Sequence, residues 1–256
     1  MAVELITIPC RADNYAWLLS DSASGLAALV DVPDAAPVLE ALEASGWTLD
    51  YIWLTHHHDD HIAGVAEVVA ATGAKVWGAA ADAHRLPPLD LALTEGAAPD
   101  FGAQAVQVFD VPGHTVGHIA YYLPGAGMAF TGDSLMSWGC GRLFEGTPAQ
   151  MFGSLAKFAA LPPETVICSG HEYTLSNGRF ALSLEPDHPD LLARMAAAEM
   201  ARAQGHPTLP VDLATELATN PFLRGSDPAL ARALGLAEGA DALAVFTAAR
   251  AAKDRF

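Results

Sequence analysis

The chain places four histidines and two aspartates within seven consecutive residues, Thr55-His56-His57-His58-Asp59-Asp60-His61. The β-branched and aromatic residues 51–54 precede this run and are typical of a buried strand. Residues 62–73 follow it and predict a helix that ends at a glycine. Imidazole and carboxylate groups are ligands that divalent Zn, Mn and Fe accept. A purification tag would lie at a terminus, so the position of the run favours a metal site.

The spacing within this run predicts where its side chains point. Side chains of extended chain alternate with a period of two, so His56 and His58 are expected on one side. Asp60 and His61 follow where the chain turns, and they can point at a second position nearby. His57 points to the opposite side, and we expect it to be a packed or hydrogen-bonded neighbour.

Composition indicates a protein with a substantial core and little affinity for polyanions. The 256 residues are 52% hydrophobic with a mean hydropathy of +0.24, enough for one large domain or a domain with an appendage. Thirteen basic residues face 30 acidic ones, a net charge of −17, which argues against a nucleic-acid partner. Only three lysines occur, so any basic residue near the metal loop is notable.

Location and redox state are also predicted from the sequence. No apolar run reaches the roughly 18 residues needed to span a bilayer, so we expect no membrane partner. Residues 1–5 carry Glu4 where a signal peptide needs positive charge, so a cytoplasmic location is expected. Cys10, Cys140 and Cys168 are odd in number and widely spaced, which argues against a disulfide framework.

The pattern of elements predicts an α/β protein with a helical carboxy-terminal part. Apolar segments bounded by turn residues predict strands at 3–8, 15–19, 26–32, 51–54, 75–77, 105–111, 119–123, 128–131 and 165–168. The first three are expected to form an antiparallel meander, and residues 84–102 are expected to be mostly loop. Helices are predicted at 34–45, 62–73, 148–161, 175–184, 189–204 and 228–252. We expect no strand after Tyr173.

Four of the predicted strands end at a histidine or an aspartate: His56, His114, Asp133 and His171. Strand ends gathered on one edge of a sheet commonly position a site. With His58, Asp60 and His61 they make seven donors, too many for one tetrahedral zinc. The set suits two metals with three donors each, one shared carboxylate and one shared water, which metal binding would make a hydroxide at neutral pH.

The motifs containing these donors resemble those of the metallo-β-lactamase superfamily. They are His56-x-His58-x-Asp60-His61, Pro112-Gly113-His114-Thr115-Val116-Gly117-His118, Thr131-Gly132-Asp133 and Gly170-His171-Glu172-Tyr173. Within that superfamily, Gly139-Cys140-Gly141-Arg142-Leu143-Phe144-Glu145-Gly146 and Asn220-Pro221-Phe222-Leu223-Arg224 resemble glyoxalase II, the hydroxyacylglutathione hydrolases. The resemblance covers nearly the whole chain.

The resemblance implies a fold, an activity and a ligand set. The fold would be an αββα sandwich at residues 1–171 that binds metal, followed by a helical substrate-binding domain at 172–256. The activity would be hydrolysis of S-D-lactoylglutathione to glutathione and D-lactate in methylglyoxal detoxification. One metal would lie on His56, His58 and His114, and the other on Asp60, His61 and His171, with Asp133 bridging. Zinc is the expected metal, with iron or manganese as alternatives.

The family also implies catalytic and substrate residues. Asp60, His61 and Asp133 are expected to be catalytic as well as metal ligands, and Arg142, Phe144, Tyr173 and Arg224 to contact glutathione. Phe144 and Asp227 stand where animal members have tyrosine and lysine, so we expect a weaker or different grip on glutathione.

The remaining histidines and neighbouring polar residues are given structural roles. His118 is expected to form structural hydrogen bonds, and His84, His188 and His206 to lie at the surface. Cys140 is expected to pack as a small residue, and Glu172 is either an orienter of a ligand or exposed. We expect the protein to be a monomer. Its expected partner is a small molecule, a glutathione thioester.

Three other functions are compatible with parts of the pattern. A glutathione persulfide dioxygenase of the same superfamily would need one iron held by two histidines and a carboxylate. Retention of all seven donors favours two metals. A nuclease is disfavoured by the net charge, and a non-enzymatic metal-loaded binding module is disfavoured by the intact donor set.

Overall fold

The computed structural model describes residues 3–256, and these divide into two compact units. The first unit comprises residues 3–110, Gly117–Gly132 and Cys168–His171. The second comprises Val111–Val116, Asp133–Ile167 and Glu172–Phe256. Met1 and Ala2, part of the segment from which we predict a cytoplasmic location, lie outside the described residues.

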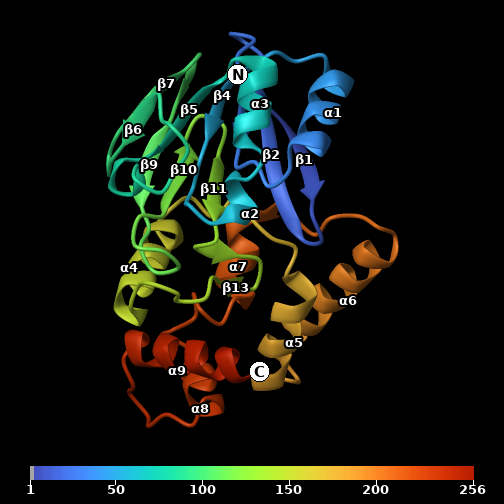
Figure 1. The fold of residues 1–256 in the computed structure, drawn as a ribbon. Helices are drawn as coiled ribbons and strands as arrows, with labels where there is room; N and C mark the ends of the chain where they lie inside the picture. Colours follow the sequence, from blue (N-terminus) through green and yellow to red (C-terminus); the bar gives the residue numbers. More distant parts are fainter. Residues whose placement is uncertain (1–2) are drawn as a thin grey trace. The chain divides into compact units, whose positions relative to one another are not determined.

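A six-stranded sheet in the order β1-β2-β3-β4-β5-β6 forms one layer of the first unit (Figure 1). Its strands are β1 (Val3–Cys10), β2 (Asn14–Asp21), β3 (Ala27–Val30), β4 (Leu49–Trp53), β5 (Lys75–Ala79) and β6 (Leu91–Leu93). The first three pair antiparallel and the next pairs are parallel, so the predicted meander is confirmed. β6 lies in the segment predicted to be mostly loop.

Further strands of the first unit belong to a second sheet and a small ribbon. The second sheet contains β9 (Gln107–Asp110), β10 (Ile119–Leu123), β11 (Met128–Gly132) and the end of β14 (Val166–Ser169). β7 (Asp100–Phe101) and β8 (Gln104–Ala105) form the ribbon. β14 begins in the second unit, where its start pairs antiparallel with β15 (Val211–Asp212).

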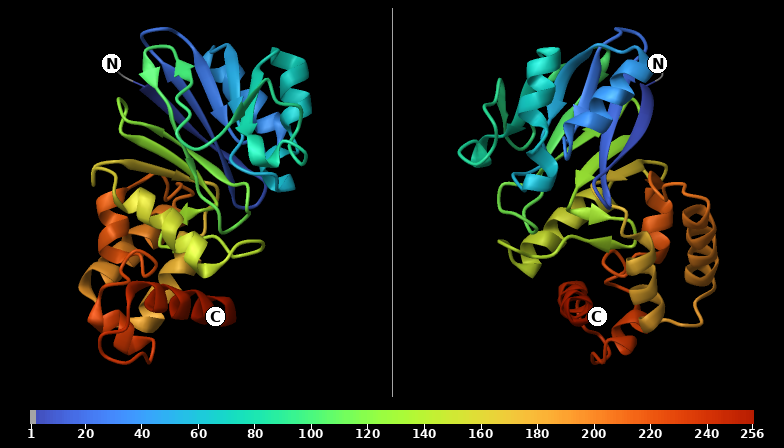
Figure 2. Two further views of the ribbon diagram at one scale, coloured as in Figure 1. Left: turned by 90° about the vertical axis from the view of Figure 1, so that its left-hand side faces the viewer. Right: turned by 45° about the vertical axis from the view of Figure 1, so that its right-hand side comes forward.

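Aromatic side chains fill the space between the two sheets of the first unit, which lie face to face in Figure 2. The ring of Trp53 on β4 lies 5.5 Å from Trp77, 5.3 Å from Tyr121 and 6.5 Å from Phe130, measured between centroids. The Tyr121 hydroxyl donates to the Leu54 carbonyl at 2.9 Å, which joins β10 to the end of β4. Burying a tryptophan of this kind contributes about 4–6 kcal/mol. The core therefore fixes the strand end from which the histidine loop emerges.

Two helices, α1 (Ala35–Ser45) and α3 (Val65–Thr72), pack against each other and on the first sheet. The helix predicted at 62–73 is confirmed from Val65 to its end at Gly73, but it begins later than predicted, because the chain forms a short α2 (Asp59–Ile62) and then bends before α3. A Cβ at Gly64 would lie 2.7 Å from the backbone nitrogen of Ala35, so the bend brings the backbones too close for any side chain. A 3-10 turn, η1 (Ala80–Asp82), follows β5.

The second unit is largely helical. Its helices are α4 (Pro148–Ala159), α5 (Thr174–Leu184), α6 (Pro189–Ala203), α7 (Leu213–Thr219), α8 (Pro228–Ala233) and α9 (Ala242–Arg255). The predictions of α4, α5 and α6 are confirmed. The single helix predicted at 228–252 is wrong, because Gly235 and Gly239 adopt left-handed φ values of 74° and 81° that end α8 and prevent continuation. The short strand β15 also contradicts the expectation of no strand after Tyr173.

A hairpin of β12 (Leu135–Met136) and β13 (Gly139–Cys140) carries the glycine-cysteine-glycine motif of the second unit. Trp138 at its turn has a left-handed φ of 57°. Its backbone N–H donates at 2.9 Å to Glu216, a fully buried carboxylate that also pairs with Arg194. The amide of Asn220 donates to the carbonyls of Met136 and Gly139 at 3.3 and 3.0 Å, so buried polar groups hold this turn.

The predicted α/β class is confirmed: the first unit contains the first sheet, most of the second sheet and a helical layer, and the second unit is largely helical. Across residues 3–256, no helix is both long enough and apolar enough to cross a bilayer.

Candidate functional site

The histidine loop starts from a point held by both sheets of the first unit. The Leu54 N–H donates to the Trp77 carbonyl of β5 at 2.9 Å, and the Thr55 carbonyl accepts from Ile119 of β10 at 2.9 Å. His56 and His58 then lie on one side, as predicted, with His56 Nε2 and His58 Nδ1 3.1 Å apart. The strand end therefore places two ring nitrogens next to each other.

A second group of donors forms where α2 meets the end of β14. His61 Nε2 and His171 Nε2 are 3.3 Å apart. Oδ2 of Asp60 lies 3.4 Å from His171 Nε2 and 3.8 Å from His61 Nε2. Ligands about 2.0–2.1 Å from a tetrahedral ion are separated by roughly 3.3 Å, so this spacing fits a metal ion. Asp60, His61 and His171 are thus brought together as a set of possible metal ligands.

The positions of the ring protons of His61 and His171 determine whether their Nε2 atoms can bind a metal ion. Nδ1 of His61 lies 2.8 Å from Asp31, and Nδ1 of His171 lies 3.1 Å from Asp13. A ring nitrogen facing a carboxylate carries the proton, so both Nε2 atoms direct lone pairs inward, toward the carboxylate of Asp60. Three electron-rich atoms so close repel one another unless a cation lies among them. The donor chemistry therefore fits a divalent metal.

Asp31 reaches both groups of histidines, although sequence reasoning gave it no role. It is buried and has a left-handed φ of 58°. It accepts hydrogen bonds from the Thr55 N–H, the Thr55 hydroxyl and His61, each at 2.8 Å. The Thr55 hydroxyl in turn lies 3.0 Å from His56 Nδ1. Asp31 is close enough to His56 and His61 to count as a possible ligand, but these bonds occupy both its oxygens and make it an orienting group.

Hydrogen bonding keeps Asp60 ionised. The Asn14 amide donates to Asp60 Oδ2 at 3.1 Å and favours the charged form of this carboxyl group. Asp60 is therefore a carboxylate throughout the neutral range.

The second unit holds the two remaining predicted donors, His114 and Asp133. Both are buried, and His114 Nε2 lies 3.4 Å from Asp133 Oδ2. Nδ1 of His114 lies 2.9 Å from the Arg142 carbonyl and donates to it, so Nε2 presents a lone pair to the carboxylate. A Cβ at Gly141 would lie 2.0 Å from the Asp133 carbonyl, which explains a glycine there. This pair also has the chemistry of metal ligands.

Two other histidines support the loop. His57 Nδ1 lies 3.0 Å from Asp82, so His57 is the hydrogen-bonded neighbour we predicted. The His118 ring stacks on His56 with centroids 4.6 Å apart. A Cβ at Gly132, which has a left-handed φ of 49°, would lie 2.8 Å from the His118 ring. His118 therefore orients a candidate ligand by packing.

The outcomes for the other singled-out residues are mixed. His84 and His206 are exposed as predicted, whereas His188 is only partly exposed. Burial raises the pKa of the Cys140 thiol to about 11, which fits a packing role. Glu172 accepts from the Thr208 N–H and hydroxyl at 2.8 and 2.6 Å, so it fastens the loop that contains Thr208.

Three of the predicted substrate residues present accessible groups. The Arg142 side chain is exposed, and Phe144 is 62% and Tyr173 36% exposed. The Phe144 ring lies 5.2 Å from the His114 ring, between centroids, so an exposed apolar surface adjoins a candidate ligand. Their contact with glutathione stays a prediction.

Arg224, the fourth predicted substrate residue, is engaged within the second unit. It forms a two-pronged ion pair with Glu185 at 2.6 and 3.0 Å and a second ion pair with Asp227. Its side chain is 9% exposed. Two carboxylates already neutralise this guanidinium, so the structure favours a structural role over substrate binding.

Sequence reasoning missed a cationic group at the other end of the chain. Burial, together with the positive charges of Arg250 and Arg142, lowers the pKa of Lys253 to about 8. Arg250 is buried and donates to the Cys140 carbonyl at 3.0 Å. Arg250 is already paired with Asp254 at 2.6 Å, so Arg142 and Lys253 are the two of these cations that remain candidates for contact with substrate. The scarcity of lysine was the signal that could have found Lys253.

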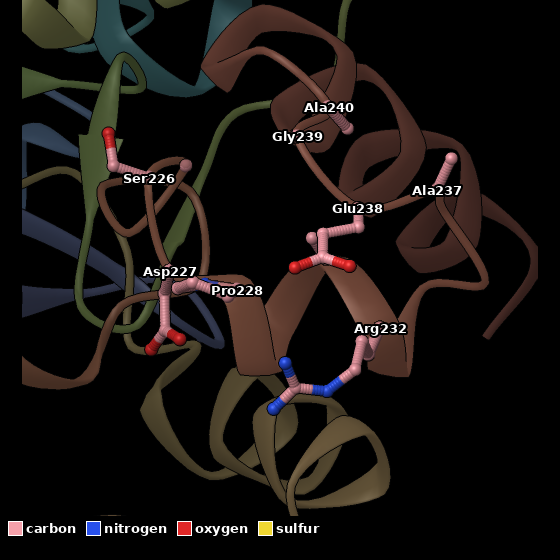
Figure 3. A pocket seen from close by; sticks show the side chains of 10 residues that line it. Ser226, Asp227, Pro228, Arg232, Ala237, Glu238, Gly239 and Ala240 are labelled. Atoms are coloured by element: carbon pink, nitrogen blue, oxygen red, sulfur yellow. The ribbon is translucent and has the colours of Figure 1, made fainter.

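A pocket of about 230 Å³ lies beside α8 in the second unit (Figure 3). Asp227, Arg232 and Glu238 line it together with small residues. It contains none of the candidate metal ligands, and Asp227 is already paired with Arg224. We therefore assign it no part in the site.

Comparison with known proteins matches both parts of the chain. The Metallo-beta-lactamase superfamily model matches residues 16–171, and the model of the Hydroxyacylglutathione hydrolase C-terminus matches residues 172–256. The hydroxyacylglutathione hydrolase of Rhodobacter capsulatus is 62% identical over 256 residues, all of both chains.

Two solved structures share the fold. The BLEG-1 B3 metallo-beta-lactamase is 23% identical with a TM-score of 0.67, covering 86% of this chain and 100% of that one. The di-iron-bound form of TTHA1623 is 28% identical with a TM-score of 0.61, covering 84% of this chain and 98% of that one.

Proposed function

This chain belongs to the hydroxyacylglutathione hydrolase family of the metallo-β-lactamase superfamily, and from that premise we propose that it hydrolyses S-D-lactoylglutathione to glutathione and D-lactate. The relative from Rhodobacter capsulatus has the same length and matches end to end, so no part of it lacks a counterpart here. We take methylglyoxal detoxification as the setting.

The facing ring nitrogens of His61 and His171 are the observation that carries the proposal. Their protons are held away from each other by Asp31 and Asp13, so their lone pairs need a cation. We propose two divalent cations per chain. One would be held by His56, His58 and His114 and the other by Asp60, His61 and His171, with Asp133 available to both. Zinc is our first choice, and the di-iron form of the 28% identical relative makes iron the alternative.

Two divalent cations in this donor set would lower the pKa of a water molecule and polarise the thioester carbonyl. The protein's own part is to keep the donors in the right protonation state. Asp31 and the Arg142 carbonyl hold protons on the Nδ1 atoms of His61 and His114. The ionised carboxylates of Asp60 and Asp133 carry negative charge that partly neutralises the positive charge of the cations. Hydrolysis forms a carbon–oxygen bond and breaks the carbon–sulfur bond, and a thiol with a pKa of about 8.5 leaves with little need for an acid.

We propose that the glutathione part is bound by cations of the second unit. Arg142, which is exposed, and Lys253 would bind a carboxylate of the substrate, because two cations near each other favour an anion. Tyr173 and Phe144 would contact the peptide and thioester with their exposed rings. We propose that residues 172–256 form the substrate-binding domain, to which Arg142 and Phe144 are added from residues 1–171, the otherwise metal-binding domain.

The test is a thiol-release assay with S-D-lactoylglutathione combined with elemental analysis of the purified chain. The proposal expects about two divalent metals per chain, release of one thiol per substrate and loss of activity after chelation. A glutathione persulfide dioxygenase would instead consume dioxygen with one iron per chain. Fewer than two metals together with no thiol release would refute the proposal.

We also propose that the chain acts as a cytoplasmic monomer. Every residue assigned to metal or substrate comes from one chain. The three cysteines are free and buried, as suits a reducing compartment.

A further inference from the structure

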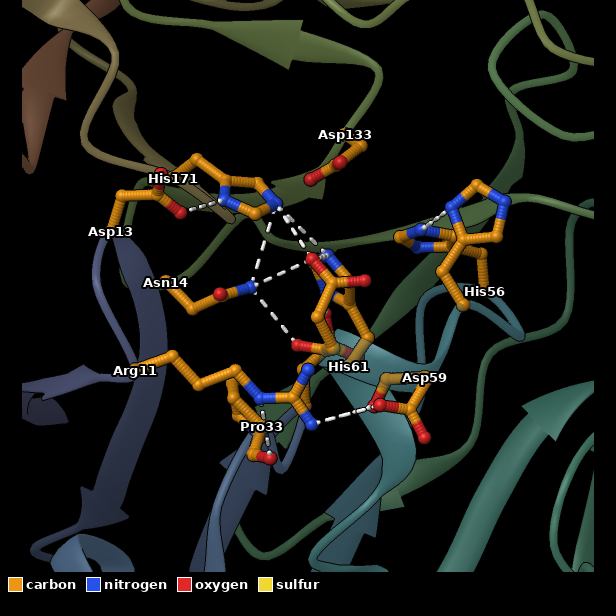
Figure 4. Close-up of polar contacts among 12 residues, drawn as sticks. Arg11, Asp13, Asn14, Pro33, His56, Asp59, His61, Asp133 and His171 are labelled. Atoms are coloured by element: carbon orange, nitrogen blue, oxygen red, sulfur yellow. Dashed lines mark hydrogen bonds and ion pairs between the residues drawn. The ribbon is translucent and has the colours of Figure 1, made fainter.

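The turn between β1 and β2 contacts the Asp60, His61 and His171 group through Asp13 and Asn14, and its Arg11 contacts the neighbouring Asp59. Figure 4 shows Arg11, Asp13 and Asn14 pointing from this turn toward Asp59, His61 and His171. None of the motifs that predict the metal centre includes these three residues, and all of their partners lie in the same unit. The contacts are specific enough to define a role.

Asp13 determines which nitrogen of His171 faces inward. Its Oδ1 lies 3.1 Å from His171 Nδ1. A carboxylate accepts and cannot donate, so Nδ1 carries the proton and Nε2 is left with a lone pair. The Asp13 side chain is 40% exposed, so its burial contributes little to the core.

Asn14 fixes the carboxylate that completes this group. Its Nδ2 lies 3.0 Å from the Asp60 carbonyl and 3.1 Å from Asp60 Oδ2. An amide nitrogen has two protons, and these two acceptors use both. The 3.5 Å approach of the same nitrogen to His171 Nε2 therefore consumes no lone pair of the ring.

Arg11 ties the turn to the start of α2. Its φ of 48° is left-handed for a residue with a side chain, so the surrounding contacts must hold it. Its Nε donates to the Pro33 carbonyl at 3.2 Å, and its Nη2 pairs with Asp59 at 3.0 Å. The backbone is fastened as well, since the Tyr15 N–H donates to the Gly170 carbonyl at 2.8 Å.

We propose that residues 11–14 form a positioning clasp for the Asp60, His61 and His171 cation site. Asp13 fixes the tautomer of His171, Asn14 fixes the carboxylate of Asp60, and Arg11 anchors the turn to the loop. The proposal rests on the metal centre proposed above. Asp13, Asn14 and Arg11 are positioning residues, because they act through the ligands.

The first experiment measures the tautomer of His171 in the metal-free full-length chain. Long-range ¹H–¹⁵N correlation spectra are recorded on ¹⁵N-histidine protein at about pH 8.5, where a histidine of ordinary pKa near 6.5 is neutral. The His171 signals are identified by their absence from His171→Gln. We expect the Nδ1–H form in the wild type and in Asp13→Asn, which keeps an acceptor oxygen, and a shift toward the Nε2–H form in Asp13→Ala. Predominance of the Nε2–H form in the wild type would overturn the proposal.

The second experiment measures zinc affinity by competition with a coloured chelator. Removing an orienting partner of a ligand lowers metal affinity about tenfold to hundredfold. We expect that loss at one of two sites for Asp13→Ala and Asn14→Ala, and less than tenfold for Asp13→Asn. Glu4→Ala, an exposed carboxylate on the same strand pair, is the matched control and should bind as the wild type does. Wild-type affinity at both sites in both alanine variants would refute the clasp.

These readouts separate the clasp from the proposed activity. The tautomer is measured without metal or substrate, so it judges the clasp even if a variant folds poorly. A wild-type chain with the Nδ1–H form and normal zinc binding but no thioester hydrolysis would refute the function and support the clasp.

Discussion

Oδ2 of Asp31 lies 2.8 Å from Nδ1 of His61, and the same carboxylate holds Thr55, whose hydroxyl lies 3.0 Å from His56. One buried carboxylate therefore orients a histidine of each donor group in the first unit. Asp31 adopts a left-handed backbone conformation to reach both histidines, and this conformation is strained for a residue with a side chain.

Replacing Asp31 with alanine should weaken metal binding as well as the fold. We expect zinc affinity to fall about tenfold to hundredfold. The free energy of unfolding of the metal-free chain should fall by about 1–3 kcal/mol, because buried donors lose their acceptor. Chelator competition and urea denaturation measure the two effects.

Asp21→Ala is the matched control for Asp31→Ala. Asp21 is fully buried and accepts from Ser24, Ala103 and Gln104, with none of the candidate metal ligands among its partners. Its loss should destabilise the chain and leave zinc affinity unchanged. Equal effects of both variants on zinc affinity would mean that Asp31 acts only through stability.

The assignment of His114 and Asp133 is tested by metal content. We expect His114→Ala or Asp133→Ala to reduce the metal content below two per chain and to abolish thioester hydrolysis, because each removes a donor. His57→Ala should keep most of both, since His57 bonds to Asp82 and points away from the candidate ligands. Two metals per chain in a folded, inactive Asp133→Ala protein would contradict the bridging role.

The strand before the histidine loop and the directions of its side chains could be predicted, because strand ends and a period of two are local properties. The strand before His56 and the shared side of His56 and His58 follow from residues within a few positions. The partners Asp31, Asp13 and Asn14 could not be predicted in the same way. They are separated from His61 or His171 by 30 to 158 positions, and only the packed fold brings them near.

The features that the sequence did not reveal also depend on contacts between residues far apart in the chain. The break at Gly64 depends on the close approach of Ala35, which a helical pattern at 62–73 does not reveal. Arg224 was assigned to the substrate from its place in the family motif at 220–224, and its pairing with Glu185, 39 positions away, is not visible in the sequence. An ion pair between residues so far apart in the sequence can be recognised only from the folded structure.

Arg224→Ala should therefore affect stability more than substrate binding. The change leaves Glu185 and Asp227 without their shared cation, and breaking a mostly buried pair of this kind costs about 3–5 kcal/mol. We expect a lower melting temperature and a KM for lactoylglutathione within about threefold of the wild type. A tenfold rise in KM for lactoylglutathione, absent for a lactoyl thioester lacking carboxylates, would restore Arg224 as a substrate residue.

Lys253 should give the enzyme a pH dependence on the alkaline side. Its pKa is lowered to about 8, so the ammonium is charged below that pH and neutral above it. If it binds a substrate carboxylate, kcat/KM for lactoylglutathione should fall as the pH rises through about 8. The change should appear in KM, because the carboxylate is held equally in the ground and transition states. Steady-state rates from pH 6.5 to 9.5 measure it.

Variants of Lys253 separate its titration from that of the substrate or the metal centre. Lys253→Arg keeps its charge across this range and should remove the alkaline rise in KM, because arginine has a pKa above about 12. Lys253→Ala should raise KM about tenfold at pH 7, close to 1.4 kcal/mol, and also flatten the profile. Lys75→Ala, an exposed lysine on β5, should behave as the wild type does. An unchanged alkaline limb in Lys253→Arg would assign the titrating group elsewhere, and the same limb with a thioester lacking carboxylates would place it at the metal centre.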